Sequence, residues 1–121
     1  MVLENGTATG ADESINPHDG IYLFNITYST IISTLGSSNA TAGITLQDSF
    51  NNTFISMTGI TNFSSGIRVE NSTNNVFISP RAVGLASGSS GIILYNSTGI
   101  LFSDCSFISG ATRDVALDAQ F

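Results

Sequence analysis

The chain has 121 residues, a formal net charge of −6 and no lysine, and 41% of its residues are hydrophobic. An acidic surface with only three arginines argues against a nucleic-acid partner, because phosphate binding requires clustered basic side chains. No run of 18 apolar residues is present, so we expect no membrane span. The length suits one domain, and the single Cys105 excludes an internal disulfide.

Residues 1–19 have the least regular pattern and are predicted to be an irregular N-terminal segment with a partial first repeat unit. Leu3-Glu4-Asn5 matches Leu23-Phe24-Asn25 at a step of 20 residues, which predicts a strand there, and a polar loop from Gly6 to Asp19 follows. The loop contains four potential metal ligands, Asp12, Glu13, His18 and Asp19. One histidine without a fixed ligand spacing is a weak signal, so we expect a solvated loop, no metal ion and no cofactor.

From residue 20 onward the sequence repeats. The anchor glycines are Gly20, Gly43, Gly66 and Gly91, at steps of 23, 23 and 25 residues. Apolar and polar residues alternate after each glycine, and a second apolar column, Ile31 in the first unit, follows about eleven residues after it. Alternation with period two predicts strands with one buried face. The predicted core columns are Ile21, Leu23, Ile44, Leu46, Ile67, Val69, Ile92, Leu94, Val115, Leu117, Phe54, Phe77 and Phe102.

A unit this short cannot bury its apolar face alone, so like residues must stack on neighbouring coils at roughly 4.8 Å. Ser, Thr, Asn and Gly between the apolar columns are turn formers, and the pattern lacks the 3.6-residue period of a helical solenoid. A β-sandwich has no reason to repeat residue for residue. The sequence predicts an all-β, single-stranded right-handed parallel β-helix of about five coils of roughly 23 residues over 20–121.

The repeated pattern GIxLxNSxxNxFI resembles the right-handed parallel β-helix repeat of pectate-lyase-like and NosD-like proteins over residues 20–118. The resemblance implies the fold, which serves lyases, hydrolases, adhesins, viral spikes and surface proteins alike. It also implies that polysaccharide chemistry, where present, uses the outer face of the first strand column. The lyases gather calcium-binding carboxylates on this face, whereas Thr45, Gln47, Ile93 and Tyr95 stand at those positions here. Catalysis is therefore not assigned to any residue.

The outward positions of that column are candidates for glycan contact. Besides Phe24 and Thr45, they are Tyr22, Gln47, Arg68, Glu70, Tyr95 and Asp118. Aromatic rings could stack on sugars, and Arg68 and Glu70 could bond hydroxyl or carboxylate groups, or simply pair with each other. Glu70 and Asp118 are expected roughly 10 Å apart from the coil spacing, at the edge of the roughly 6.5–9.5 Å of inverting glycosidases.

Asparagine is open to two interpretations. The chain has seven Asn-x-Ser/Thr sequences, which are candidate N-glycosylation sites, at Asn5, Asn25, Asn39, Asn51, Asn62, Asn71 and Asn96. Asn25, Asn71 and Asn96 share one repeat position with Asp48, which instead predicts a stacked asparagine ladder at a turn. Asn39 and Asn62 lie outside that column, so they are the favoured sites for a sugar.

A two-residue insertion between Pro80 and Ser90 predicts a bulged loop. Natural solenoids cap their ends, and no capping helix is visible, so we expect association with copies of the chain, end to end or as a trimer. The favoured function is a structural or assembly subunit on an extracellular, cell or virion surface, with or without glycans. The alternative is a polysaccharide-binding or polysaccharide-degrading module.

Overall fold

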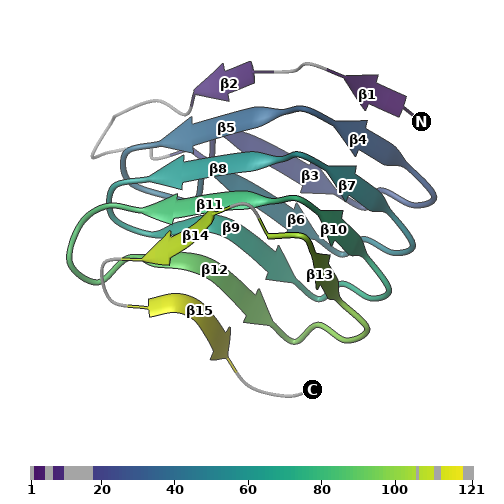
Figure 1. The fold of residues 1–121 in the computed structure, drawn as a ribbon. Coiled ribbons are helices and arrows are strands. Elements are labelled where there is room, and N and C mark those ends of the chain that lie inside the picture. The colour runs from purple at the N-terminus through teal and green to yellow at the C-terminus, as the bar shows by residue number, and fades with distance from the viewer. Residues whose placement is uncertain (1, 5–6, 10–17, 106, 111–112, 119–121) are drawn as a thin grey trace.

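The computed structural model describes residues 2–4, 7–9, 18–105, 107–110 and 113–118, with side chains for 18–105, 108 and 109. In these ranges the chain is all β, and every strand pairs in parallel with its neighbours in one of three five-stranded sheets (Figure 1). The predicted parallel β-solenoid is therefore confirmed. No helix of the described ranges is long and apolar enough to cross a membrane.

Each turn of the solenoid passes through three sheets in order, which we name A, B and C. Sheet A contains β1 (Val2–Glu4), β4 (Thr30–Ile32), β7 (Thr53–Ile55), β10 (Val76–Ile78) and β13 (Leu101–Ser103). Sheet B contains β2 (Thr7–Thr9), β5 (Leu35–Ser38), β8 (Thr58–Thr61), β11 (Arg81–Gly84) and β14 (Phe107–Gly110). Sheet C contains β3 (Ile21–Phe24), β6 (Ile44–Gln47), β9 (Ser65–Glu70), β12 (Ser90–Tyr95) and β15 (Arg113–Asp118). The solenoid makes about four turns, slightly fewer than the predicted five.

Like side chains stack on like in register. In sheet C, Ile44 pairs with Ile21 and with Ile67, and in sheet A, Phe77 pairs with Phe54 and with Phe102. The phenylalanine rings stack at centroid distances of 4.6 and 5.0 Å. The buried core contains Ile31, Ile44, Leu46, Phe54, Met57, Ile67, Val69, Phe77, Ala82, Ile92 and Leu94, with Ile21, Leu23 and Phe102 partly buried against it. Val115 and Leu117 lie in β15, outside the residues whose side chains are described.

The N-terminal strand lies in a different sheet from the one predicted. Leu3 pairs with Ile31 of sheet A, so the predicted match between Leu3 and Leu23 is wrong. The loop predicted from Gly6 also contains a strand, β2, whose Ala8 pairs with Gly36. The reason is that each of the three sheets offers an apolar column with which a three-residue strand can pair. A motif as short as Leu-Glu-Asn does not determine which sheet the strand joins.

The corners of the coils are left-handed backbone positions that form three columns. The columns are Asn25, Asp48, Asn71 and Asn96; Tyr28, Asn51, Asn74 and Gly99; and Ser33, Ser56, Ser79 and Asp104, with φ between 44° and 62°. Asn, Asp and Gly tolerate this region better than other residues. The backbone geometry therefore explains why asparagine recurs at the turns.

Sheets B and C approach each other closely where they meet, and glycines line this junction. A Cβ built on Gly59 would lie 2.1 Å from the Gly66 carbonyl oxygen, and one on Gly43 would lie 2.4 Å from the Ile60 amide nitrogen. These are backbone atoms of the facing sheet, so no side-chain rotation can relieve the overlap. The anchor glycines thus recur because two backbones touch at this edge of the core.

The inserted residues form a turn after β11. The Ser89 amide and hydroxyl both donate to the Ala86 carbonyl, at 3.0 and 2.5 Å, and Gly88 has φ 91°. The predicted bulge at this position thus corresponds to one tight turn between sheets B and C.

Polar side chains also stack inside the solenoid. Asn52 Nδ2 and the Asn52 amide both donate to Asn75 Oδ1, at 3.0 Å each, and Asn75 Nδ2 donates to the Ser49 carbonyl at 2.9 Å. A second ladder joins serines: the Ser49 amide donates to Ser72 Oγ, and the Ser72 amide donates to Ser97 Oγ, both at 3.1 Å. All five side chains are at most 1% exposed. These ladders satisfy backbone amides at corners where no sheet partner is available.

The predicted asparagine column is stacked in part, and a second, buried ladder lies elsewhere in the repeat. In the column from Asn25 to Asn96 the side-chain contact is a single bond, from Asn96 Nδ2 to Asn71 Oδ1 at 2.8 Å, and it is exposed. The buried ladder uses Asn52 and Asn75, four residues after the column's Asp48 and Asn71.

Candidate functional site

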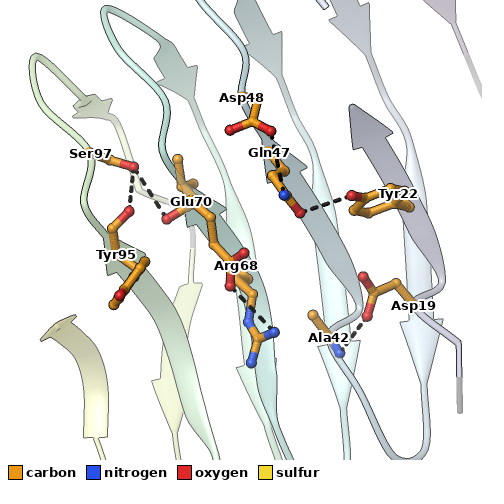
Figure 2. Close-up of polar contacts among 10 residues, drawn as sticks. Asp19, Tyr22, Ala42, Gln47, Asp48, Arg68, Glu70, Tyr95 and Ser97 are labelled. Atoms are coloured by element: carbon orange, nitrogen blue, oxygen red, sulfur yellow. Dashed lines mark hydrogen bonds and ion pairs between the residues drawn. The ribbon is translucent and has the colours of Figure 1, made fainter. Parts of the chain in front are cut away.

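The candidate site is the outer face of sheet C, which was predicted from the alternation along each strand. Register places Tyr22, Thr45, Arg68 and Ile93 in one row across β3, β6, β9 and β12. A second row contains Phe24, Gln47, Glu70 and Tyr95. The structure thus brings the predicted residues of these four strands onto one face, and Figure 2 shows their polar contacts.

The β3 end of this face is aromatic. Tyr22 and Phe24 stack with ring centroids 6.1 Å apart and planes inclined by 12°, and their exposed fractions are 54% and 53%. Tyr22 Oη donates to Gln47 Oε1 at 2.8 Å, and Gln47 Nε2 is 3.5 Å from Asp48 Oδ2 (Figure 2). The hydrogen bond fixes the tyrosine ring over the neighbouring strand. The result is an exposed pair of nearly parallel aromatic rings beside the amide group of Gln47.

The middle of the face carries one ion pair. Arg68 Nη1 lies 3.5 Å from Glu70 Oε1, and the side chains are 37% and 26% exposed. A pair this exposed contributes roughly 0–1 kcal/mol to folding. The two charges of this pair offset each other, so among the described side chains of this face Arg68 is not a lone cation and Glu70 is not a lone carboxylate.

Thr45 and Asp118 differ from the other predicted positions of this face. Thr45 was expected on the open face, but it is only 3% exposed, because it lies in register between the longer side chains of Tyr22 and Arg68. Its Oγ1 has no hydrogen-bond partner among the described residues. Asp118 lies opposite Tyr95 in the register, but its side chain is outside the described set, so the expected separation of the Glu70 and Asp118 carboxyl groups stays a prediction.

The residues considered for a metal loop fall into two groups. Asp12 and Glu13 lie outside the described residues. Asp19 Oδ1 accepts a hydrogen bond from the Ala42 amide at 3.0 Å, which is a structural cap on the next coil, and His18 is exposed. Among the described residues no three His, Cys, Asp or Glu side chains gather where they could hold a metal ion.

The glycosylation candidates differ in how their side chains are engaged. Asn25 and Asn51 are exposed at left-handed turns. Asn39 and Asn62 lie outside the Asn25 column, and Asn62 Nδ2 donates to Asn39 Oδ1, so their occupation by a sugar stays a prediction. Asn71 accepts from Asn96, and Asn5 lies outside the described residues.

A second surface was missed at the level of sequence, namely the outer face of sheet A. Ile32, Ile55 and Ile78 directly follow the buried column of Ile31, Phe54 and Phe77, and they point to the opposite side. The signal was present, since residues on either side of a buried strand position face outward. It was missed because isoleucine next to phenylalanine forms a continuous apolar run, in which the alternation between inward and outward residues is not visible.

Comparison with protein-family models, with curated proteins and with solved structures found no match for this chain. The resemblance to pectate-lyase-like and NosD-like repeats thus extends as far as the parallel solenoid topology.

Proposed function

We propose that the chain is a structural β-solenoid that assembles with copies of itself on an extracellular, cell or virion surface. The observation that supports this role best is the use of the recurring side chains. The recurring side chains are buried and connect one coil to the next. The phenylalanine rings stack, and the serine and asparagine side chains form hydrogen bonds between coils. The outward rows of sheet C do not recur from coil to coil. The recurring residues therefore stabilise the stacking of the coils, as expected for a structural rod.

The chemistry of the described surface supports the same role. Arg68 and Glu70 on the sheet C face pair with each other, and the carboxylate of Asp19 accepts a hydrogen bond from a backbone amide. None of these groups is arranged against a nucleophile or a general base. Asn25 and Asn51 are exposed at turns, so either could carry a sugar if the chain is exported.

The purified chain is expected to self-associate reversibly as its concentration rises. Sedimentation velocity and light scattering from about 10 µM to 1 mM, the range in which weak interfaces form, would show the average mass increasing above one chain. Electron microscopy of the concentrated sample would show rods or a defined oligomer. A mass of 12.6 kDa across the whole range would contradict the assembly role.

A glycan-binding role is the second candidate, and the observation that favours it is the stacked pair of Tyr22 and Phe24. Two nearly parallel, half-exposed aromatic rings can offer a ring face to the apolar face of a sugar. Gln47 lies beside them with hydrogen-bonding atoms at the surface. Because Arg68 is neutralised by Glu70, the face favours a neutral glycan over a uronic-acid polymer.

Replacing Tyr22 with alanine is expected to abolish any binding to neutral oligosaccharides, since the ring supplies the contact area and positions Gln47. A glycan array followed by calorimetry would measure this, with Leu101→Ala on sheet A as the control that retains binding. If no neutral glycan binds the unmodified chain, with or without calcium, the second candidate is excluded.

A further inference from the structure

The candidate glycosylation sequence Asn25-Ile26-Thr27 presents both of its essential residues at the surface. Asn25 and Thr27 are exposed, and Ile26 between them is packed against the core. Asn25 has φ 54°, and this left-handed turn interrupts the alternation of β3, so Phe24 and Asn25 are both exposed although they are consecutive. The acceptor amide, the threonine of the sequence and an aromatic ring therefore lie together at the corner between sheets C and A.

The ring of Phe24 is a large exposed surface directly beside the acceptor. It is 53% exposed, and it stacks on Tyr22 with ring centroids 6.1 Å apart. The Cα atoms of consecutive residues are about 3.8 Å apart, so a sugar linked to Asn25 Nδ2 begins within reach of this ring. The apolar face of a sugar packs favourably on an aromatic ring. Such packing covers apolar surface that otherwise stays in contact with water.

Asn25 differs from the other asparagines of its repeat column. Asn96 Nδ2 donates to Asn71 Oδ1 at 2.8 Å, so these two side chains engage each other, and two sugars one coil apart would be crowded at roughly 4.8 Å. The next position in the column after Asn25 is Asp48, which cannot carry an N-linked sugar. The Asn25 backbone amide donates to the Gln47 carbonyl, whereas its side chain bonds to none of the described residues. The structure thus leaves room for one glycan at this end of the column.

Asn51 also follows a phenylalanine and is also exposed at a left-handed turn. Its neighbour Phe50 is 38% exposed, because it lies in register between threonines of the coils on either side. Phe24 offers more of its ring than Phe50 does. Asn25 is therefore the described site that best combines a free acceptor with an accessible aromatic ring.

We infer that Asn25 carries an N-linked glycan whose first sugar packs against Phe24. This rests on the proposed function, because N-glycosylation is a modification of exported and surface proteins. The folded chain holds the sugar and the ring together at a fixed turn, and the unfolded chain does not, so the glycan stabilises the fold. The exposed Phe24 ring then has a partner within the same molecule and requires no free ligand.

The first measurement is the occupancy of each site in the full chain, expressed in a eukaryotic cell behind a cleavable signal sequence. An amidase converts each glycosylated asparagine to aspartate, and peptide mass spectrometry of the secreted and the cell-retained chain then locates the sugars. Asn25 is expected to be glycosylated in most molecules. Asn71 is the matched control, with the same repeat position and φ 46°, but it follows Glu70, and it is expected to be occupied less. An unmodified Asn25 contradicts the inference, whichever other sites carry sugar.

The second measurement tests the packing on Phe24 by a double-mutant cycle. Thr27→Val removes the acceptor sequence and keeps the branched shape, and Phe24→Leu removes the ring and keeps an apolar residue. The Asn25 glycan is expected to raise the thermal midpoint by roughly 2–6 °C in the unmodified chain, and by less than half of that in Phe24→Leu. The same variants made without glycans in bacteria supply the baseline. An equal increment with and without the ring contradicts the packing.

Trimming the glycan to its first sugar with an endoglycosidase distinguishes that sugar from the outer ones. The increment is expected to survive trimming, and its loss would contradict the role of the first sugar. The assembly role is decided separately, by sedimentation of the glycan-free chain. If Asn25 is unmodified and the chain associates, the inference fails and the assembly role stands. If Asn25 is glycosylated with the expected increment and the chain stays monomeric, the assembly role fails and the inference stands.

Discussion

Replacing Gly59 with alanine is expected to destabilise the solenoid by about 3 kcal/mol or more, because the added methyl group would overlap the backbone of the facing sheet. The new Cβ would lie 2.1 Å from the Gly66 carbonyl oxygen, 2.7 Å from its carbonyl carbon and 2.9 Å from Ile67 Cγ1. The carbonyl belongs to β9, the central strand of sheet C, whose position is fixed by pairing with a strand on each side. Denaturant unfolding followed by circular dichroism would show a large drop in the midpoint.

Gly88→Ala is the matched control for that change. Gly88 has φ 91°, so alanine there adds backbone strain, but nothing lies within 4 Å of the position a Cβ would occupy. A loss of about 1 kcal/mol is expected. Equal losses at Gly59 and Gly88 would mean that the close approach of sheets B and C does not determine stability.

Replacing Asn75 with alanine is expected to cost about 4 kcal/mol, since it removes three buried hydrogen bonds at once. Asn75 Oδ1 accepts from the Asn52 amide and from Asn52 Nδ2, and Asn75 Nδ2 donates to the Ser49 carbonyl. Without Asn75 two buried donors of Asn52 lose their acceptor, and each unsatisfied group costs roughly 1–3 kcal/mol. The measurement is again the shift of the unfolding midpoint.

Asn51→Gly serves as the comparison for Asn75→Ala, because Asn51 is exposed and has φ 58°. Glycine tolerates that backbone region, so the change is expected to shift the free energy of unfolding by less than about 0.5 kcal/mol. A loss at Asn75 no larger than the loss at Asn51 would show that the ladder does not stabilise the stack.

The repeat period was enough to predict the solenoid and the residues that face its interior. Ile44, Ile67 and Phe77 recur at a fixed step, and recurrence with alternation requires stacking in register. The recurrence of glycine was visible in the sequence. Its reason is the contact between the backbones of sheets B and C, which only the structure shows. The assignment of Leu3 failed because three residues cannot specify which of three sheets they join.

The candidate site could be predicted only in outline. The alternation identified Tyr22, Gln47, Arg68 and Glu70 as outward, and they do share a face. Their pairing could not be read from the pattern, because Tyr22 bonds to Gln47 across a 25-residue separation. The burial of Thr45 depends on the lengths of its neighbours on both adjacent strands, which alternation ignores.

The amino-acid order alone therefore determined the architecture of this chain, since a 23-residue period of alternating residues is compatible with one way of burying them. The tertiary structure decided which asparagines bond inside the stack and which lie at turns. It also decided which groups on the outer surface pair with one another. These properties depend on distances between residues one coil apart, and such distances exist only after the backbone has closed each turn.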